Sequence, residues 1–451
     1  MIKRRDFIGG LGVGAAATMI PASGSAATNR VVVIGGGMAG AAVAKYLRLW
    51  SNKTILVTLV APATTYVSNI MSNLVLTGQN AYSTLNFDYA KLKSNYGIVV
   101  ETATALEIAG FGANATGTVK LSNGKTLTCE RVVLAPGIKM DPIPLTGSPA
   151  TAAPVLHAWQ AGQQTLDLQR LLLNMPTNGV YVMSIPPKPY RCPPGPYERA
   201  CVVADYLRRN KPGAKIVVLD ANPGIVAEPV NFGNAFKTYI DAGVLQYVSS
   251  TSVVSVSAGA GPGDRQFVTT NNSATPLFGD VVNIIPPHRA PDIVSNTGLV
   301  PPGGAFAPVD VRSYESTIAG KSKIHVLGDA SDTSLPKAGH VANQEAKICA
   351  AAIIAQFAGA TPSPAPTANS ACFSPIDSTQ ASWLTAVYQY SETQNASGAV
   401  TALPANKRMV IWNGTGAIGD VQPATEADAP STKNFGQMTK WYGVLMSDTF
   451  A

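Results

Sequence analysis

The chain contains short continuous runs of apolar residues that alternate with segments of helical spacing. Continuous apolar runs of about four to eight residues are typical of strands buried on both faces of a parallel sheet. Apolar residues at every third or fourth position indicate helices that cover such a sheet. The predicted strands span residues 29–34, 54–60, 131–135, 179–185, 215–219 and 323–327, and the predicted helices span residues 41–50, 199–207 and 338–357. This order predicts a doubly wound α/β fold.

A glycine-rich loop follows the first predicted strand and precedes the first predicted helix. It reads Gly-Gly-Gly-Met-Ala-Gly from Gly35 to Gly40. A Gly-x-Gly-x-x-Gly loop in the order strand, loop, helix is the fingerprint of a dinucleotide site. We predict that Gly35 makes the turn, that Gly37 lets the backbone approach a pyrophosphate, and that Gly40 lets the helix pack on the strand.

Two later strands end in further small residues. The strand at 131–135 closes on a turn that begins at Ala135, and the strand at 323–327 ends in Gly328-Asp329. FAD enzymes of the glutathione-reductase type carry such a pair in this order, and their Asp contacts the ribityl or pyrophosphate part of FAD. We therefore predict that FAD is bound by Gly35, Gly37, Gly40, Ala135, Gly328 and Asp329.

The fold class that follows is α/β, a glutathione-reductase-like tandem Rossmann fold with a small C-terminal α+β domain. We predict an FAD-binding domain in two pieces, 28–145 and 281–355. A degenerate NAD-like second Rossmann domain would occupy 146–280, and the C-terminal domain would occupy 356–451. The segment 359–369, rich in Pro, Ala and Thr, separates the last two as a linker.

The loop at 191–199, Arg-Cys-Pro-Pro-Gly-Pro-Tyr-Glu-Arg, stands where the second domain should carry its own phosphate-binding glycines. Proline removes the backbone N–H and blocks the close approach that a pyrophosphate needs. The second nucleotide site is therefore predicted to be lost. Cys192 precedes the predicted helix, where the partial positive charge of the N-terminus favours a thiolate.

The N-terminus reads Met-Ile-Lys-Arg-Arg-Asp-Phe-Ile, followed by a weakly apolar, small-residue stretch up to residue 27. Adjacent arginines before a short apolar segment are typical of a twin-arginine export signal, so we expect residues 1–27 to be removed and the protein to be periplasmic. The rest of the chain has no apolar run of about 20 residues, so no membrane span is expected. The formal net charge is +7, without a basic cluster interleaved with aromatics, and this argues against a nucleic-acid partner.

The chain has five cysteines, so at least one is unpaired within it. No Cys-x-x-Cys-His motif is present, so a haem would have to come from another chain. The histidines form no metal-ligand spacing with the cysteines, and no metal site is predicted. Cys129 and Cys201 are expected to be ordinary core residues, and His340 is expected at a helix start more than in proton transfer.

Several segments together resemble one family, the flavoprotein (FAD-binding) subunit of flavocytochrome c sulfide dehydrogenase. They run from the N-terminal signal to the last residue. They are the loop at 191–199, His-Ala-Trp-Gln-Ala-Gly at 157–162, Ile-Pro-Pro-His-Arg-Ala at 285–290, Pro-Val-Asp-Val-Arg-Ser-Tyr-Glu at 308–315, Trp-Tyr at 441–442 and Asp-Thr-Phe at 448–450.

The resemblance implies a periplasmic FAD enzyme in which sulfide attacks a redox-active disulfide beside the flavin and electrons pass to a c-type cytochrome subunit. Cys192 matches one of the two redox cysteines, and Glu198 matches a carboxylate near the flavin that is a candidate proton carrier. Their alternatives are a small residue that fills a tight turn and a carboxylate favoured by the helix dipole.

Three positions depart from the family pattern. The family's second redox cysteine follows Gly-Asp-Ala, where this chain has Ser331. The cysteine that binds FAD covalently in the family corresponds to Asn69, so noncovalent FAD is expected. The second strand ends in Ala61 in place of an acid that would bind a ribose. Cys201, Cys349 and Cys372 are not expected beside Cys192, so Cys192 is expected to work alone opposite Ser331.

The leading hypothesis is therefore an FAD-dependent oxidoreductase that oxidises sulfide or a related reduced sulfur compound and delivers electrons to a c-type cytochrome. A second hypothesis is an FAD oxidoreductase with another small-molecule donor. A third is a flavin-free, noncatalytic binding subunit of a cytochrome complex. Visible flavin absorbance separates the third from the first two, and bleaching by sulfide separates the first from the second.

Overall fold

The computed structural model describes residues 29–112, 116–146, 155–257, 266–333, 335–391, 408–411 and 425–451. Its largest sheet has eight strands in the order β23-β20-β21-β22-β9-β1-β2-β5. The strands are β1 (Arg30–Ile34), β2 (Leu56–Ala61), β5 (Val99–Thr102), β9 (Arg131–Leu134), β20 (Ala307–Asp310), β21 (Glu315–Ser316), β22 (Ile324–Val326) and β23 (Ser331–Asp332). Its central strands are parallel, with β22, β9, β1, β2 and β5 as neighbours. Strands far apart in the sequence thus form one sheet.

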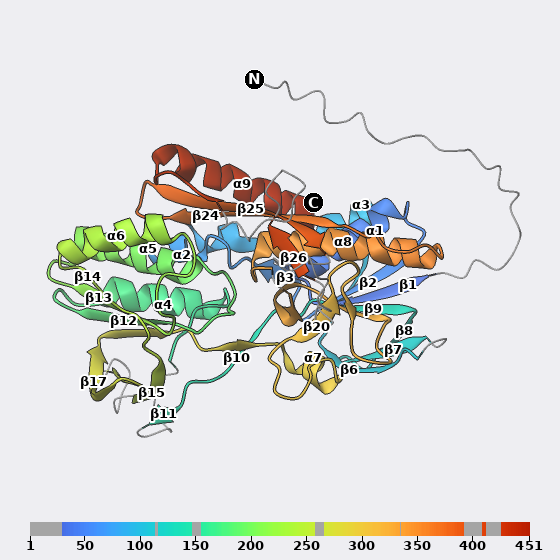
Figure 1. Ribbon diagram of the computed structural model, residues 1–451, viewed down its shortest axis with the longest axis horizontal. Helices are drawn as coiled ribbons and strands as arrows, with labels where there is room; N and C mark the ends of the chain where they lie inside the picture. Colours follow the sequence, from blue (N-terminus) through green and yellow to red (C-terminus); the bar gives the residue numbers. More distant parts are fainter. Residues whose placement is uncertain are drawn as a thin grey trace, which may run out of the picture.

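Two helices lie together along this sheet, α1 (Met38–Trp50) and α8 (Gly339–Phe357). The turns of α1 that pack inward are made of alanine and other small residues, which allows the two helices to approach closely. Figure 1 shows both helices in the right-hand part of the molecule, above β1 and β2. The sequence patterns at 41–50 and 338–357 predicted these helices to within three residues at their starts.

A second parallel sheet has the order β14-β13-β12-β18. Its strands are β12 (Val180–Ile185), β13 (Lys215–Asp220), β14 (Leu245–Val248) and β18 (Val281–Ile284). The helices of this part are α4 (Gln163–Asn174), α5 (Gly195–Asn210) and α6 (Pro229–Asp241). It forms the left-hand part of Figure 1, and every residue of β18 is buried.

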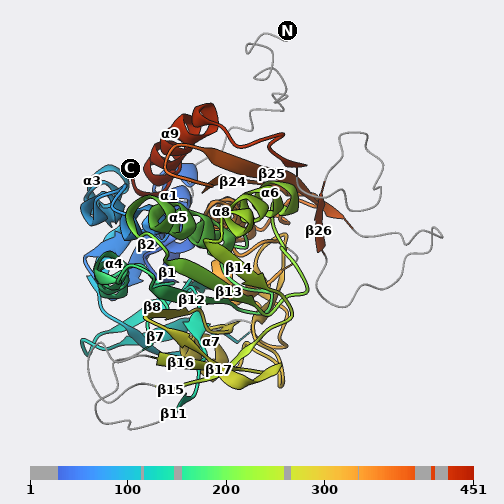
Figure 2. The ribbon, with the colours of Figure 1, turned by 90° about the vertical axis from the view of Figure 1, so that its left-hand side faces the viewer.

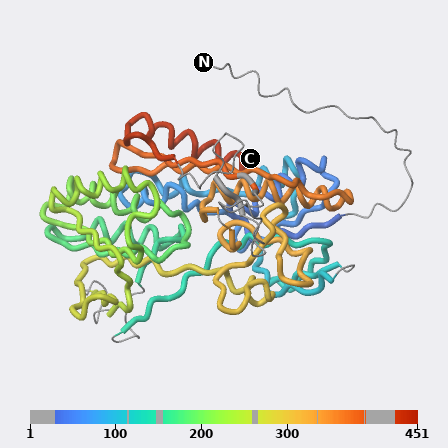
Figure 3. Tube along the Cα trace, in the orientation of Figure 1, coloured from blue at the N-terminus to red at the C-terminus, as the bar shows by residue number. Residues whose placement is uncertain are grey.

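Two connections join the two parts of the molecule and pair with each other. They are β10 (Lys139–Met140) and β19 (His288–Arg289), which run antiparallel. Figure 3 shows both as single passages of the chain. A small sheet beneath the second part contains β11 (Leu145–Thr146), β15 (Val253–Ser257), β16 (Gln266–Thr270) and β17 (Ser273–Gly279).

The C-terminal segment crosses over both parts (Figure 2). Its elements are β24 (Thr367–Pro375), β25 (Ala381–Ser391), β26 (Arg408–Ile411), β27 (Thr425–Glu426) and α9 (Thr432–Phe450). Strand β24 packs on α8 and also contacts α5. The last turn of α9 is held by Lys45, whose Nζ donates to the carbonyl oxygens of Asp448 and Ala451 at 2.8 and 2.6 Å. A cation at a helix C-terminus is electrostatically favourable.

The remaining elements are short. They are β3 (Thr65–Val67), β4 (Asn86–Asp88), β6 (Ala105–Gly110), β7 (Gly117–Leu121), β8 (Thr126–Cys129), α2 (Ser72–Leu76), α3 (Ala90–Tyr96), α7 (Asp292–Asn296) and the 3₁₀ turns Tyr82–Leu85 and Gly328–Ala330. In the described part of the chain, no helix combines the length and apolar character needed to cross a bilayer. The domain boundaries given above stay a prediction, and residues 1–27, the expected export signal, lie outside the described residues.

Candidate active site

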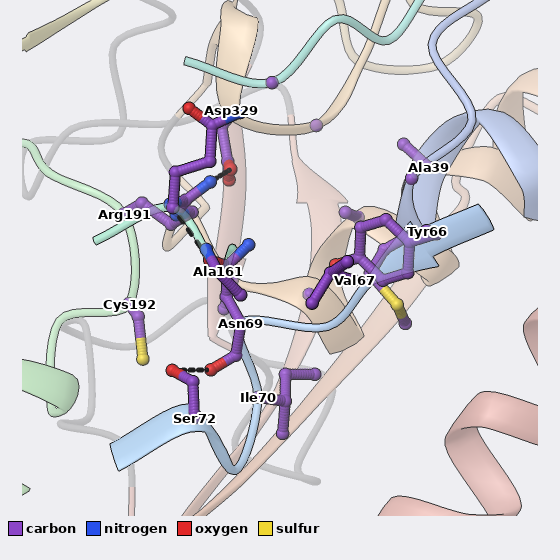
Figure 4. A pocket seen from close by; sticks show the side chains of 18 of the residues that line it. Ala39, Tyr66, Val67, Asn69, Ile70, Ser72, Ala161, Arg191, Cys192 and Asp329 are labelled. Carbon is purple, nitrogen blue, oxygen red and sulfur yellow. Dashed lines mark hydrogen bonds and ion pairs between the residues drawn. The ribbon is translucent and has the colours of Figure 1, made fainter. Parts of the chain in front are cut away.

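A cavity of about 410 Å³ lies where the two Rossmann parts and the C-terminal strands meet. Its wall includes five stretches of sequence: the glycine-rich loop, the segment around α2, the loop before α5, and the segments at 327–342 and 371–373. Residues 135–138 and 158–161 line it as well. Figure 4 shows labelled side chains from all five stretches except 371–373 around one space. All eight site residues predicted from the sequence line this cavity except Gly40, which lies behind its wall.

The glycine-rich loop is shaped to leave room for a ligand. Gly35 has φ of +109°, and a β-carbon there would lie 2.2 Å from the Ala135 oxygen. A β-carbon on Gly40 would lie 1.7 Å from the Gly35 oxygen, so helix and strand pack too closely for any side chain. By contrast, a β-carbon on Gly37 would meet only the Tyr66 ring, at 3.4 Å, and would otherwise fill the cavity. The space that Gly37 leaves open is where a pyrophosphate meets the N-terminus of α1.

The far side of the cavity is formed by the Gly328-Asp329 turn. Gly328 has φ of +70°, and its N–H donates to the buried Glu345 carboxylate at 2.5 Å. This bond fixes the turn that presents Asp329 to the cavity. Ala61 ends β2 as expected, and the Tyr89 hydroxyl donates to the Gly36 oxygen beside it at 3.0 Å. The cradle of small residues, the open N-terminus of α1 and the Asp329 carboxylate together fit FAD.

Cys192 is held in a strained turn at the edge of the cavity. Its φ is +58°, a left-handed conformation that non-glycine residues seldom adopt. Its N–H donates to the Lys337 oxygen at 2.6 Å, and its oxygen accepts from the Gly195 N–H at 2.9 Å. These bonds direct the thiol inward, and Figure 4 shows it pointing toward the segment of Asn69 and Ser72. Burial raises the pKa of Cys192.

Arg191, the residue before Cys192, brings a cation to the same wall. Its guanidinium lies 4.0 Å from the Asp329 carboxylate and 3.4 Å from Asn69 Oδ1 (Figure 4). Asn69 Oδ1 also accepts from the Ala161 N–H at 2.6 Å. The amide at the position of the family's covalent FAD cysteine therefore orients neighbouring groups.

Glu198 belongs to a buried network that starts in the first turn of α5. Its Oε1 accepts from Asn73 Nδ2 at 2.9 Å, and Asn73 Oδ1 accepts from Arg199 Nε at 2.8 Å. Burial raises the pKa of Glu198 to about 8, although the bond from Asn73 and the charge of Arg199 act in the opposite direction. The carboxyl group therefore carries a proton at neutral pH, within the cavity that Cys192 also lines.

Arg199 itself is 1% exposed and connects several segments. Its guanidinium donates to Asn283 Oδ1 on β18 at 2.9 Å and to the oxygens of His157 and Ala158 at 2.9 and 2.7 Å. It also lies over the Trp159 ring, 4.7 Å from the centroid. A buried guanidinium whose three nitrogens all donate in this way fixes its neighbours in place.

The structure corrects the expected partner of Cys192. Ser331 is not among the residues that line the cavity, and its Oγ donates to the Gly328 oxygen at 2.8 Å. Cys372 lines the cavity together with Cys192, and a charge on Cys372 raises the pKa of Cys192 further. Cys372, which was not expected beside Cys192, therefore lies on the same cavity, and both thiols are free in the structure.

The geometry of α8 and β24 explains how Cys372 reaches this cavity. Helix α8 carries the chain away from the cavity for about 28 Å, at ~1.5 Å per residue. The extended segment after it covers the same length in about nine residues and returns Cys372 to the helix start. There His340 Nδ1 accepts from the Ala371 N–H at 3.0 Å and holds the strand against α8. The residues after the linker can be recognised in the sequence as a strand, but the sequence does not show that this strand packs on α8.

The second nucleotide site is closed by the protein's own side chains. Asp220 ends β13, where an acid would bind a ribose in a Rossmann domain. One of its oxygens accepts from the hydroxyls of Tyr197 and Tyr247 at 2.8 and 2.7 Å. The other accepts from the backbone N–H and the Nδ2 of Asn222, both at 2.8 Å. The carboxylate is 0% exposed, so it is not presented to a ligand.

Three other cysteines and two histidines lie buried or partly buried in the described part of the chain. Cys129 and Cys201 are fully buried, which confirms them as core residues, and Cys349 is fully buried as well. Burial lowers the pKa of His157 to about 4 and that of His288 to about 3, so both rings are neutral. No group of His, Cys, Asp and Glu among the described residues is arranged to hold a metal ion.

Solved structures with the same fold cover most of the chain. The sulfide:quinone oxidoreductase of Aquifex aeolicus aligns with a TM-score of 0.68 at 16% identity, over 94% of this chain and 91% of that one. A ferredoxin reductase of Rhodopseudomonas palustris aligns with a TM-score of 0.58 at 16% identity, over 81% and 84%. These likenesses establish the α/β fold with FAD and NAD-like Rossmann parts.

Sequence comparisons are more specific. Residues 29–173 match the family model of pyridine nucleotide-disulphide oxidoreductases. Residues 165–286 match the model of the central part of the sulfide dehydrogenase (flavocytochrome c) flavoprotein chain, which includes Cys192 and Glu198. The sulfide dehydrogenase flavoprotein chain of Chlorobaculum thiosulfatiphilum is 54% identical over 48 residues, which cover 98% of that relative and 11% of this chain. The chain therefore belongs to the family of flavocytochrome c sulfide dehydrogenase flavoprotein chains.

Proposed function

We propose that this protein oxidises sulfide at a redox pair formed by Cys192 and Cys372 and passes the electrons through FAD to a c-type cytochrome. The family and the cavity identify the protein as an FAD-dependent oxidoreductase of sulfur compounds. The observation that carries the proposal is that both thiols line the cavity that also holds the glycine-rich loop and Asp329. When bound, FAD accepts an electron pair and passes the electrons on.

The first step requires an oxidised pair. Hydrosulfide attacks one sulfur of a Cys192–Cys372 disulfide, a new S–S bond forms to that cysteine, and the other cysteine leaves as a thiolate. The products are a persulfide and a thiolate, so charge and atoms balance. Arg191 brings positive charge to the cavity wall, and it lowers the pKa of Cys192 against the effect of burial. The same charge would help to hold the attacking anion.

Glu198 would handle the proton. Because its carboxyl group is protonated below pH of about 8, it can donate its proton to the cysteine that leaves as a thiolate, and the carboxylate so formed can then accept the proton of the persulfide. Asn73 fixes the orientation of the carboxyl group, and Arg199 fixes Asn73. In this proposal Glu198 carries the proton, and Arg199, the next residue on α5, holds Glu198 in place through Asn73.

The acceptor is proposed from the relatives. The relative from Chlorobaculum is named as the flavoprotein chain of a flavocytochrome c, which supports a cytochrome partner. The structural neighbour from Aquifex is named as a sulfide:quinone oxidoreductase, which makes a quinone the second candidate acceptor. Export by the twin-arginine route to the periplasm, where c-type cytochromes are found, completes the proposal.

An anaerobic titration tests the function. Purified, flavin-containing protein is mixed with sulfide, and the flavin absorbance is followed by stopped flow. We expect bleaching by sulfide in the unmodified protein and bleaching at least about 100-fold slower in Cys192→Ser and Cys372→Ser, because each leaves no disulfide to attack. Dithionite should bleach all three equally. A Cys372→Ser variant that bleaches at the unmodified rate would exclude the pair.

The acceptor is tested with the reduced protein. We expect oxidised c-type cytochrome to restore the flavin absorbance and a soluble quinone to do so much more slowly. The reverse order would identify a quinone reductase and overturn the cytochrome assignment. Flavin that bleaches with dithionite but with no sulfur compound would favour another donor.

A further inference from the structure

A second buried carboxyl group lies behind Cys372, outside the groups assigned above. Glu228 is 0% exposed, and its Oε1 accepts from Ser374 Oγ at 2.6 Å. Its Oε2 is buried and accepts no hydrogen bond of good geometry among the described residues, although the Ser382 hydroxyl lies near enough to lower the pKa of Glu228. An incompletely paired buried carboxyl group is costly to the fold, so its presence needs a reason.

The position of Ser374 links this carboxyl group to the thiol. Cys372 and Ser374 are two residues apart on β24, and side chains at such positions point to the same face of a strand. Ser374 thus holds Glu228 on the face from which Cys372 reaches the cavity. Ser382, the cross-strand neighbour of Ser374 on β25, lies at the same level and accepts from Asn231 Nδ2 at 3.0 Å.

The backbone around Glu228 is arranged to place the side chain here. Glu228 has φ of +48°, in the left-handed region, and directly precedes α6. It comes from the loop after β13, whereas Ser374 comes from the C-terminal segment, so the contact joins two distant parts of the chain. Figure 2 shows α6 close to β24 and β25. The strained turn and the interdomain hydrogen bond together fix one carboxyl group next to the strand of one thiol.

We propose that Glu228 is a positioning residue for the proton of Cys372: its buried carboxyl group controls whether the Cys372 thiol is protonated during sulfide oxidation. The inference rests on the proposed redox role of Cys372. It assigns to this cysteine a carboxyl group of its own, beside the one that Glu198 contributes to the shared cavity.

The charges around the pair support this role. The pKa of Cys372 is raised to about 12 by burial, and next by the charge of Glu228 and then that of Glu198. Burial raises the pKa of Glu228 to about 7, so its charge changes within the working range. The other titratable groups that interact with Glu228 are Glu198 and Cys201 on α5 and Glu426 on β27. A negative Glu228 therefore keeps the proton on Cys372, and a neutral Glu228 lets it leave more easily.

The test is the pH dependence of alkylation of Cys372 by iodoacetamide. It uses the flavin-loaded full chain with Cys192→Ser, so that Cys372 stays a free thiol, and peptide mass spectrometry assigns the site. It needs neither sulfide nor an acceptor, so its outcome is separate from that of the proposed function. In this parent, log rate should rise with less than unit slope near pH 7, because Glu228 ionises there and opposes formation of the thiolate.

Adding Glu228→Gln should restore unit slope and raise the rate above pH 8 by about tenfold, the factor that one pKa unit on the thiol gives. Glu228→Asp should keep the break in slope. Asp241→Asn, which removes an exposed carboxylate from the other end of α6, should reproduce the parent. A Glu228→Gln profile that superimposes on the parent in flavin-loaded protein would overturn the proposal.

Ser374→Ala provides a second test if Glu228→Gln does not retain flavin. Loss of the Ser374 hydrogen bond removes an interaction that lowers the pKa of Glu228. The break in the alkylation profile should therefore move to higher pH. A break that stays at the parent's pH would contradict control of Cys372 by Glu228.

Discussion

A β-carbon on Gly195 would lie 2.8 Å from the sulfur of Cys192. It would also lie 2.9 Å from the ring of Trp159, so the thiol fits only because residue 195 has no side chain. Gly195 is the first residue of α5, and its N–H holds the turn that carries Cys192. At the position where a Rossmann domain would carry phosphate-binding glycines, the missing side chain of Gly195 thus makes room for the Cys192 sulfur.

Gly195→Ala should therefore displace the Cys192 thiol without removing it. We expect sulfide to bleach the flavin at least about tenfold more slowly, with a loss of folding stability of about 1–3 kcal/mol from overpacking. Stopped-flow absorbance and chemical denaturation measure the two effects. Gly233→Ala on α6 is the control, because a β-carbon there meets no atom within 4 Å. It should leave the rate unchanged and stabilise α6 by about 0.5–1 kcal/mol.

The number of titratable thiols tests whether Cys372 is the redox partner of Cys192. The chain has five cysteines, so a Cys192–Cys372 disulfide leaves three thiols in denatured, oxidised protein and five after reduction. Cys372→Ser should show four thiols in both states. Ser331→Ala should behave as the unmodified protein, with a cost of about 0.5–1.5 kcal/mol for its hydrogen bond to Gly328. Five thiols in the protein as isolated under air would contradict the pair.

Much of this site follows from local sequence. The strands, the glycine-rich loop and the Cys192 loop were predictable because each is a short segment whose residue types determine its backbone geometry. Gly35 and Pro196 are examples. The placement of Cys372 was not, because it depends on how far α8 extends and where β24 docks. The local sequence around Asn73 and Glu228 likewise does not predict a role for either residue. An asparagine on a short helix and a glutamate after a proline-glycine turn become informative only when the fold surrounds them with polar partners.

Asn69 should make flavin attachment noncovalent, because an amide cannot form the thioether that a cysteine forms. Trichloroacetic acid should release all the flavin into the supernatant. Asn69→Cys places a thiol on the same cavity wall and should leave a fraction of the flavin in the protein pellet. Ser72→Cys, a neighbouring wall position, serves as the control and should release its flavin. Flavin retained by the unmodified protein would refute the noncovalent assignment.

The rate of flavin bleaching by sulfide should change with pH in a way that depends on Glu198. Because its pKa is raised to about 8, the protonated form predominates below that pH and is lost above it. Sulfide-driven bleaching that uses this proton should fall above pH 8. Glu198→Gln should slow it by about 100-fold, within the range for one acid–base group, and should remove the inflection. Glu107→Gln, on an exposed strand, should keep the inflection, and an unchanged profile in Glu198→Gln would rule out the proton role.

Glu345 should make folding stability depend on pH. Burial raises its pKa to about 8, whereas an unfolded glutamate titrates near its model value of 4.5. Between these values the folded state holds a proton that the unfolded state has released, so stability is greatest below about pH 4.5 and falls as pH rises to 8. Over this range the free energy of unfolding should fall less in Glu345→Gln than in the unmodified protein. The difference should be about 1.4 kcal/mol for each unit by which folding raises the pKa of Glu345. Denaturant midpoints at pH 5 and pH 8 measure it, and parallel losses in both proteins would contradict the assignment.

Tyr197, Tyr247 and Asn222 donate hydrogen bonds to both oxygens of Asp220, and this has a consequence for the electron carriers that the protein can use. Nicotinamide-linked flavoenzymes exchange electrons with a cofactor pool that many other enzymes share. Here that position is filled by the protein's own side chains, and one of them, Tyr197, belongs to α5, the helix that follows the Cys192 turn. A nicotinamide cofactor is therefore not expected to bind at Asp220, and the electrons that FAD exchanges here are expected to come from and go to other carriers.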